Sequence, residues 1–582
     1  MNHRRLTIPA AVVGCLGIAL APAFAEASTS SQTTAKQAAV SSALSPLKSG
    51  RYTFDSPLSK SVFHKTVAAH AATATAGTAG PNPDLAIGVG GAAISSHGME
   101  VVVLVGGLTT GTGTVTFSWG DGSTSYTTTL TGSTADDGIQ EVDVPDHTYS
   151  ALGTYTLDAT VTDGDGDTAE NAVNATTGSD FVPFGPQRVL DTRKDEGANG
   201  PVGANKTAQL QVVGAKDAAG DTVPAGITAV VLNVTVTQET ANGYLTVYGD
   251  NDVNGDAQEN PGTSNLNFRA GQNIANLVTV PVGTDGLVDF FNGAKGSTQV
   301  LADIAGYDTA SSASSYVAIT PTRVLDTRKG LGAAKAQIPS DKSINVTVAG
   351  ANGIPATATA VAVNLTAVDA TANGLITAYP TGQALPGVSN LNYPANVTTA
   401  NMAIIPIGTN GQVTFFNSSN GPTDLLADVA GYYTADSTVA GASAYIPFPA
   451  PERLYDSRSS EDDSLITGAD LGYPSPLHTN TSYPIPLSDP SQPFTTGVFN
   501  ATVVSPTGNG YLAFYPYAPS QPTKPSTSNL NYRTGQTIPN AVFVSPSSIE
   551  DPNFNDSNDG AVYLGGTGTA QVILDWFGLF AQ

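Results

Sequence analysis

The chain from about residue 81 onward consists of short apolar runs separated by turns rich in Gly, Asp and Ser. Between residues 81 and 178 these runs occupy 85–94, 99–105, 115–119 and 153–162, at a spacing typical of a β-sandwich. Further along, Asn233 and its neighbours Thr235 and Thr237 alternate with four apolar residues, and Asn364 and Asn500 take the same phase. This alternation predicts strands with one face in a core and the asparagine on the polar face.

The composition indicates a β-rich protein of several domains. The 582 residues include 61 Gly, 38 Pro and 3 Met, and at roughly 150 residues per domain they predict about four domains. Hydrophobic residues make up 40% of the chain, enough for packed cores, while charged residues make up 12%, about half the usual share. We therefore expect an all-β fold with almost no helix.

The charge balance bears on the choice of partner. Lys and Arg number 23 against 48 Asp and Glu, which gives a net charge of −25, and no window concentrates the basic residues. Nucleic-acid binding requires a basic patch, so we expect no nucleic-acid partner. An anionic membrane surface would repel the chain, whereas metal cations would be attracted.

The first 25 residues have the pattern of a signal peptide. Arg4 and Arg5 precede an apolar stretch at 6–20, and Ala-Phe-Ala at 23–25 forms a small-x-small cleavage site. The one cysteine, Cys15, lies inside this segment, so the mature chain would hold no disulfide; a lipoprotein-type site at 12–15 is the alternative. We expect a secreted or cell-surface protein with no transmembrane segment. Residues 26–80, which are rich in Ala, Ser and Thr, should form a flexible stretch between the signal peptide and the first domain.

Residues 81–178 carry two motifs that resemble the PKD domain family. Trp119-Gly120-Asp121-Gly122-Ser123 is followed by His147-Thr148-Tyr149 and by a Gly-Thr-Tyr-Thr-Leu strand at 153–157. The resemblance implies an immunoglobulin-like β-sandwich that serves as a spacer or adhesive module. The family more often shows a longer W-x-F-G-D-G run, so the turn after Trp119 departs from the pattern.

The rest of the chain is a threefold internal repeat. Arg-Val-Leu-Asp-Thr-Arg at 188–193 returns at 323–328 and, as Arg-Leu-Tyr-Asp-Ser-Arg, at 453–458. Each copy then has an Asn-x-Thr strand, a Ser-Asn-Leu-Asn-aromatic segment and a late apolar run with one aspartate. We therefore expect three homologous β-sandwich-like domains at 180–310, 314–436 and 443–582.

These copies resemble a repeat found in secreted and cell-surface proteins of actinobacteria and some other bacteria, marked by R-[VL]-L-D-T-R, N-V-T, S-N-L-N-F and V-x-D-V-x-G-Y. The resemblance implies an extracellular accessory role and no settled activity. The third copy departs most, with Tyr455 and Ser457 in the first motif and Trp576 after its aspartate.

Arginine is concentrated in the recurring motifs, which suggests a fixed ionic network. Asp303 lies in an apolar run, so it requires a partner if it is buried, and Arg188 or Arg193 is the candidate. Arginine can grip a carboxylate with two nitrogens, which suits a latch between the first and last strand of each repeat. The latch residues are Arg188, Asp191, Arg193, Asp303, Arg323, Asp326, Arg328, Asp428, Arg453, Asp456, Arg458 and Asp575.

Two functional alternatives use the same residues. In the first, the arginines bind a carboxylate or sugar hydroxyls while Phe268, Tyr393 or Tyr532 offers a stacking face. In the second, pairs of aspartates catalyse glycoside hydrolysis, which would require carboxyl groups at a fixed separation in a cleft.

Two acidic loops are candidate calcium sites, and we expect no other cofactor. The first presents Asp163, Asp165 and Asp167 between glycines. The second matches the first half of an EF-type loop with Asp250, Asp252, Asn254 and Asp256 but has Pro261 where a glutamate would stand. The alternative for both loops is a solvated turn.

The sequence thus favours a secreted, modular, non-enzymatic protein that mediates adhesion or binds carbohydrate, with a polysaccharide or cell-wall glycan as partner and weak sites acting together. A pure structural scaffold is the first alternative, and a polysaccharide- or peptidoglycan-directed hydrolase is the second. The oligomeric state, and whether the three repeats pack together, are left open.

Overall fold

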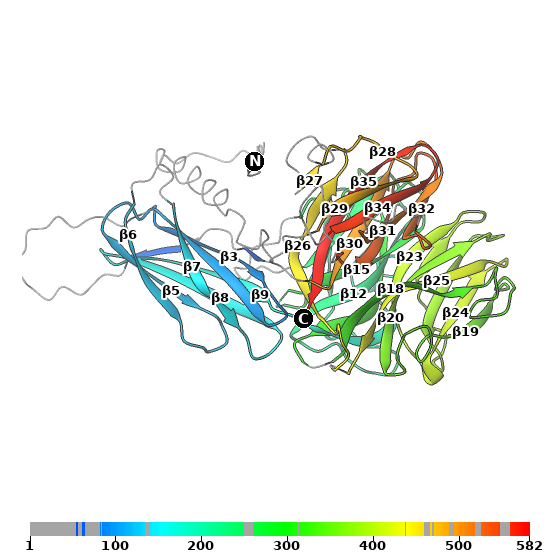
Figure 1. Ribbon diagram of the computed structural model, residues 1–582, viewed down its shortest axis with the longest axis horizontal. Coiled ribbons are helices and arrows are strands. Elements are labelled where there is room, and N and C mark those ends of the chain that lie inside the picture. The colour runs from blue at the N-terminus through cyan, green and yellow to red at the C-terminus, as the bar shows by residue number, and fades with distance from the viewer. Residues whose placement is uncertain are drawn as a thin grey trace, which may run out of the picture. The chain divides into compact units, whose positions relative to one another are not determined.

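The structure, a computed structural model, is shown as a ribbon in Figure 1. It describes the residues 54–55, 61–64, 82, 84–133, 139–249, 260–283, 285–311, 313–436, 438–458, 466–467, 471–487, 494–517, 525–547 and 559–582. The signal-peptide prediction and most of the 26–80 stretch lie outside these residues.

The predicted all-β class is confirmed. Among the described residues every element is a strand, apart from one 3₁₀ turn at Thr409–Gly411. The chain falls into two compact units. The first comprises Met1–Ala92, Met99–Thr148 and Tyr155–Ala175, and the second comprises Ala93–Gly98, Tyr149–Thr154 and Thr176–Gln582.

The first unit contains a four-stranded and a five-stranded sheet, ordered β1-β3-β4-β7 and β2-β9-β8-β5-β6. Alternating apolar residues of its strands, such as Val115 and Phe117 on β5, are buried, as period-two patterning requires. Its strands are β1 (Phe54–Asp55), β2 (Ser61–His64), β3 (Ala86–Ala93), β4 (Gly98–Gly106), β5 (Thr112–Ser118), β6 (Tyr126–Thr131), β7 (Ile139–Thr148), β8 (Thr154–Asp163) and β9 (Asp167–Thr176).

The second unit contains three pairs of sheets, which we name pair 1, pair 2 and pair 3. Pair 1 consists of β10 (Asp180–Asp191), β11 (Lys206–Gln211), β12 (Ile227–Thr237), β13 (Gly243–Gly249), β14 (Leu266–Phe268), β15 (Ile274–Pro281), β16 (Leu287–Asn292) and β17 (Gln299–Thr309). Pair 2 consists of β18 (Ser315–Asp326), β19 (Lys342–Thr347), β20 (Ala358–Val368), β21 (Gly374–Pro380), β22 (Leu391–Tyr393), β23 (Thr399–Pro406), β24 (Gln412–Ser419) and β25 (Asp424–Thr434).

Pair 3 repeats this plan and adds two short strands beside its first sheet. Its strands are β26 (Ala444–Asp456), β27 (Ile466–Thr467), β28 (Leu477–His478), β29 (Thr481–Pro486), β30 (Thr496–Val504), β31 (Gly510–Pro516), β32 (Leu530–Tyr532), β33 (Ile538–Val544), β34 (Asp559–Gly566) and β35 (Thr569–Ala581).

The same strand order occurs in all three pairs. In pair 1 the sheets run β10-β17-β12-β15 and β11-β16-β13-β14, so the first strand lies beside the last and the last beside the third. Pairs 2 and 3 have the corresponding orders, β18-β25-β20-β23 with β19-β24-β21-β22, and β26-β35-β30-β33 with β29-β34-β31-β32. Eight antiparallel strands wired in this way form a double-sheet jelly roll.

Both faces of the first sheet in each pair are buried. On β12, Val230, Leu232 and Val234 face the core of pair 1, and on the other side Ala229 and Val231 join a second cluster. That second cluster draws on all three pairs, with members such as Leu277, Met402 and Phe543. The sheet face predicted to be polar is therefore buried between pairs rather than exposed to water.

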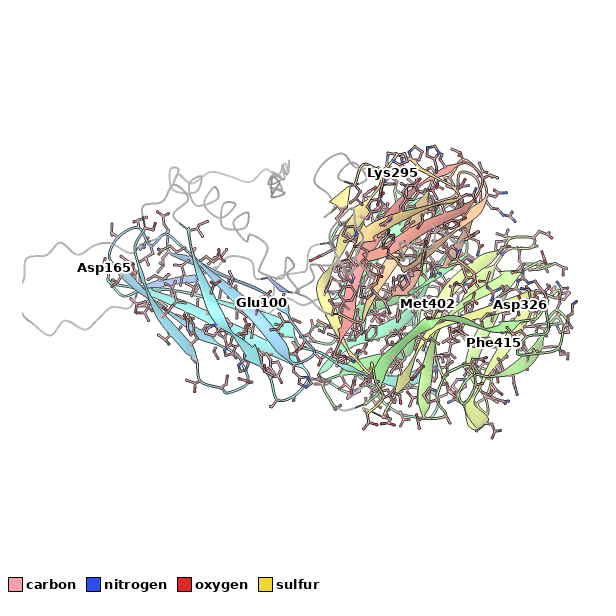
Figure 2. All side chains as sticks on the ribbon, in the orientation of Figure 1. Glu100, Asp165, Lys295, Asp326, Met402 and Phe415 are labelled. Atoms are coloured by element: carbon pink, nitrogen blue, oxygen red, sulfur yellow. The ribbon has the colours of Figure 1, made fainter. Side chains whose placement is uncertain are left out.

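Figure 1 shows the strands of the three pairs, in green, yellow and red, gathered in one body, and Figure 2 labels Met402 in its interior. The strands β15, β23 and β33, which end the first sheet of each pair, each contact the other two. The three pairs therefore pack together, which the sequence alone did not decide.

Candidate functional site: the junctions between the three sheet pairs

The recurring arginine and aspartate join the first and last strands of each pair. Arg188 on β10 is the cross-strand neighbour of Asp303 on β17. The Arg188 Nε donates to Asp303 Oδ1 at 2.6 Å and its Nη2 donates to Oδ2 at 3.1 Å. The corresponding Nε to Oδ1 distances are 2.7 Å for Arg323 and Asp428, and 2.8 Å for Arg453 and Asp575.

The second arginine of each motif binds the aspartate two residues before it. Arg193 donates from Nε and Nη2 to the two oxygens of Asp191, at 2.8 and 2.7 Å. This hydrogen bonding lowers the pKa of Asp191, even though its carboxylate is fully buried. Arg328 with Asp326 and Arg458 with Asp456 make the same pairs.

Each latch aspartate also has an asparagine as its neighbour on the other side. Asp303 lies opposite Asn233 of β12, so Arg188, Asp303 and Asn233 form a row across three adjacent strands. Side chains in one row point to one face of a sheet. The same row recurs as Arg323, Asp428, Asn364 and as Arg453, Asp575, Asn500.

This row binds the backbone of the next pair at the serine of the Ser-Asn-Leu-Asn segment. Asn233 Nδ2 donates to the carbonyl oxygen of Ser389 at 2.5 Å, and the N–H of Ser389 hydrogen-bonds to Asp303. Asn364 likewise binds the Ser528 carbonyl at 2.8 Å, and Asn500 binds the Ser264 carbonyl at 2.6 Å. The segment that recurs in the sequence is therefore a contact between pairs.

A second set of asparagines completes these junctions. Asn401 Nδ2 donates to Asn233 Oδ1 at 2.9 Å, and Asn401 is 1% exposed. The equivalent bonds run from Asn540 to Asn364 and from Asn276 to Asn500, both at 2.9 Å. Each of these asparagines also binds the Ser-Asn-Leu-Asn segment of its own pair, through the carbonyl of Asn390, Asn529 or Asn265.

These contacts close a ring. Pair 1 binds pair 2 through Asn233, pair 2 binds pair 3 through Asn364, and pair 3 binds pair 1 through Asn500. Such head-to-tail contacts between dissimilar surfaces form a closed assembly when the rotation between neighbours closes. A single chain here repeats the arrangement of a cyclic trimer.

Sequence reasoning missed the asparagines at 276, 401 and 540. A signal was available, because each lies twelve residues after the serine of its Ser-Asn-Leu-Asn segment and interrupts an apolar strand. A buried asparagine in such a strand must find hydrogen-bond partners.

The predicted stacking face is wrong for all three aromatic residues. Phe268 is 4% exposed, Tyr393 is 3% and Tyr532 is 3%, so their rings pack within the cores. The hydroxyl of Tyr393 donates to the side-chain oxygen of Asn417, inside pair 2. Because the segment's leucine and aromatic residue both face inward on a short strand, no aromatic face is left for a ligand.

The two arginines that follow the segment join pairs directly. Arg269 of pair 1 donates to the carbonyl of Gly535 in pair 3, and Arg533 of pair 3 donates to the carbonyl of Asn396 in pair 2. Pair 2 has Pro394 at this position, which has no side-chain donor, so the third contact of this kind is not made.

Burial opposes the charged form of two latch aspartates, and the third latch has fewer hydrogen bonds than the other two. Burial raises the pKa of Asp575 to about 6, although Arg453 and the Ser264 N–H oppose the shift. Burial also raises the pKa of Asp303, again against its arginine. Arg453 bonds its aspartate through Nε alone, whereas Arg188 and Arg323 use Nε and Nη2.

A cleft of about 330 Å³ lies at the junction of pair 3 with pair 1. Arg453 and Arg458 line it from pair 3, and Tyr244, Ser264 and Asn267 line it from pair 1. The latch motif and the Ser-Asn-Leu-Asn segment thus meet in one concave surface, which is the candidate binding site.

The two acidic loops differ in what the structure describes. Asp163 Oδ1 accepts the backbone N–H groups of Asp165 and Asp167 at 3.0 and 2.9 Å, so it caps its own turn. Asp167 accepts the N–H of Asn82 at 2.6 Å, and Figure 2 shows Asp165 at one end of the first unit. The loop with Asp250, Asp252, Asn254 and Asp256 lies outside the described residues. Within the described ranges no group of three or more His, Cys, Asp or Glu residues is placed to hold a metal ion.

In the part of the chain that the structure describes, no helix has the length and apolarity to cross a bilayer.

No protein-family model matches the chain, and no curated protein matches it either. Similar solved structures include "Life in the extremes: atomic structure of Sulfolobus Turreted Icosahedral Virus", at 10% identity and a TM-score of 0.13, covering 71% of this chain and 87% of that one. Another is "The Triple Jelly Roll Fold and Turret Assembly in an Archaeal Virus", at 9% identity and a TM-score of 0.14, covering 71% and 86%. Likenesses with such low TM-scores carry no argument.

Proposed function

We propose that this protein is an exported, modular, non-enzymatic protein that binds carbohydrate or mediates adhesion outside the cell. One observation carries the proposal: the latch arginines and the Ser-Asn-Leu-Asn segments meet at the junctions and line an open cleft between pairs 3 and 1. Concave sites with a few convergent polar groups are the usual form of binding sites.

The recurring aspartates are bonded to arginines, which supports a binding role rather than hydrolysis. Asp456 accepts two nitrogens of Arg458, and Asp575 lies fully buried against Arg453. A glycoside hydrolase needs one carboxyl group free to protonate the leaving oxygen and another free to attack or to activate water. Acids held in arginine pairs serve structure better than proton transfer.

We further propose that residues 81–178 form a PKD-like sandwich serving as a spacer. In its motif the Trp119 and His147 rings stack at 4.6 Å, and His147 Nε2 lies 2.8 Å from Asp121 Oδ2. Burial acts to raise the pKa of Asp121, but hydrogen bonds from Ser123 and His147 outweigh it and lower the pKa to about 2. The motif residues thus fix one another, as a structural corner would.

The three pairs are proposed to be homologous units derived from one jelly roll. The shared strand order and the repeated row of arginine, aspartate and asparagine support this proposal. Jelly rolls occur in lectins as well as in capsid proteins, so the fold itself does not decide the function.

The test is retention of the purified mature chain on bacterial cell wall and on insoluble polysaccharides, with thermal melting in the presence and absence of millimolar calcium. Retention on at least one glycan supports the binding role, and a calcium-dependent rise in melting temperature would assign the acidic loops a role. Retention on none of the glycans would contradict the binding role and leave a structural scaffold as the function.

A further inference from the structure

The cleft between pairs 3 and 1 differs from the other two junctions in its free hydrogen-bond donors. Arg453 donates only from Nε to Asp575, and its Nη1 stands 3.9 Å from Asp456, beyond hydrogen-bond range. In pairs 1 and 2 the equivalent Nη2 is used by the latch aspartate, at 3.1 and 2.8 Å. Both terminal nitrogens of Arg453 therefore donate to no described residue.

Asn267 adds a third donor in this cleft. Its Oδ1 accepts the hydroxyl of Ser264 at 3.3 Å, and its Nδ2 makes no hydrogen bond with any residue that the structure describes. The equivalent Nδ2 atoms of Asn392 and Asn531 are buried without a partner. Asn267 is half-buried and lines the cleft, so its amide can reach a ligand.

Tyr244 supplies the aromatic face that the buried Phe268, Tyr393 and Tyr532 do not supply. A Cβ on Gly293 would meet the Tyr244 ring at 2.2 Å, so the glycine backbone packs against the ring and holds it in place. Tyr244 also lines the cleft. Tyr244 lies opposite Asn267, the middle residue of a short strand, and pair 2 has Leu375 at the same register position. Pair 3 has a tyrosine there, Tyr511, which packs against Gly565.

The chemistry of these groups selects the ligand. The terminal nitrogens of Arg453 and Nδ2 of Asn267 are unengaged N–H donors, and Asp456 is paired with Arg458. Asp575 accepts Arg453 at Oδ1, while its Oδ2 and the hydroxyls of Thr263 and Thr502 are buried without a hydrogen-bond partner and lie out of reach of a ligand. A sugar hydroxyl brings a proton that needs an acceptor, whereas a carboxylate only accepts. Arginine nitrogens also bind carboxylates more strongly than neutral groups. A volume of about 330 Å³ suits one or two sugar rings.

Resting on the carbohydrate-binding function proposed above, we infer that the cleft formed by Arg453, Arg458, Tyr244 and Asn267 binds a carboxylate-bearing sugar ring, such as a uronic acid residue of an acidic polysaccharide. The carboxylate lies against the free nitrogens of Arg453 and Asn267, and the sugar ring packs on Tyr244. Arg458, which is 43% exposed, closes the outer edge.

The experiment measures binding of the full mature chain to polygalacturonate, alginate and hyaluronate, beside the neutral polymers cellulose and mannan. The wild-type chain is expected to bind at least one acidic polymer. Tyr244→Leu, which installs the residue of pair 2, and Arg458→Gln should each weaken that binding by about tenfold, equivalent to the loss of one good contact.

The matched control is Arg193→Gln, because Arg193 forms the same pair with Asp191 at another junction. It should leave binding unchanged, while circular dichroism and melting verify that every variant is folded. Binding to neutral polymers alone, or acidic binding that survives both cleft variants, overturns this inference and leaves the proposed function standing. Binding to none of the polymers overturns the proposed function and this inference with it.

Discussion

Asn233 of pair 1 donates its side-chain amide to the backbone carbonyl of Ser389 in pair 2, at 2.5 Å and across 156 residues of chain. The same bond joins pair 2 to pair 3 and pair 3 to pair 1, so a repeated sequence element closes the assembly on itself. A buried amide that loses its hydrogen-bond partner lowers the stability of the fold. These bonds therefore favour the ring over arrangements in which the pairs are separated.

Replacing the donor tests this role. We expect Asn233→Ala to lower the free energy of unfolding by about 1–3 kcal/mol, because the Ser389 carbonyl and the Asn401 amide lose a buried partner. Asn364→Ala and Asn500→Ala should cost similar amounts. Urea denaturation measures the change, and Asn199→Ala, at an exposed position between β10 and β11, is a control for general effects of substitution. An unchanged unfolding free energy for all three junction variants would refute the role.

The latch should require arginine and not only a positive charge. Arg188→Lys keeps the charge but loses the two-nitrogen grip on Asp303, so one carboxylate oxygen loses its donor. We expect a loss of about 1–3 kcal/mol in unfolding free energy and a lower melting temperature. Unaltered melting of this variant would show that the latch does not hold β10 to β17.

The buried Glu239 carboxyl group should make the protein less stable as the pH rises from about 4.5 to 7. Glu239 is 4% exposed, and burial raises its pKa to about 7, from an ordinary value of 4.5. The unfolded chain therefore releases the proton at lower pH than the folded one, and the free energy of unfolding falls between about pH 4.5 and pH 7. Asp575, with a pKa of about 6, contributes in the same direction from about pH 4.

Glu239→Gln removes the contribution of this group. The variant should match the wild type at pH 4.5 and exceed its unfolding free energy at pH 8, by an amount on the order of 1–3 kcal/mol. Denaturation curves across this pH range provide the measurement. If the unfolding free energies of the two proteins change with pH in the same way, ionisation of Glu239 does not destabilise the folded state, and this prediction is wrong.

The sequence predicted the strands and the ionic latch better than it predicted the contacts between pairs. Period-two apolar runs and abundant turn residues led to the all-β class, because strand patterning is a local property. The sequence also offered Arg188 or Arg193 as the partner of Asp303, and the structure places Arg188 there while Arg193 binds Asp191.

The junctions could not be predicted in the same way. Asn233 alternates with valines as a solvent-facing residue would, yet it is 3% exposed, because a neighbouring pair covers that sheet face. The alternation of residues along a strand shows that one face of the sheet is apolar and the other polar. It does not show whether water or another part of the protein covers the polar face. Tyr393 illustrates the converse, since an aromatic residue beside arginines suggested a ligand site, whereas its short strand turns the ring inward.

Chemical cross-linking between pairs 1 and 3 tests the closed ring most directly. Arg269 of pair 1 reaches the backbone of Gly535 in pair 3, so cysteines at Arg269 and the adjacent Thr534 should be joined by a short bis-maleimide in a chain carrying Cys15→Ser. The ring predicts an intramolecular link between positions 269 and 534 in the folded protein, found by peptide mass spectrometry and lost in urea. Absence of that link in the folded chain, with both thiols reactive, would mean that the three pairs are strung out along the chain and would contradict the account.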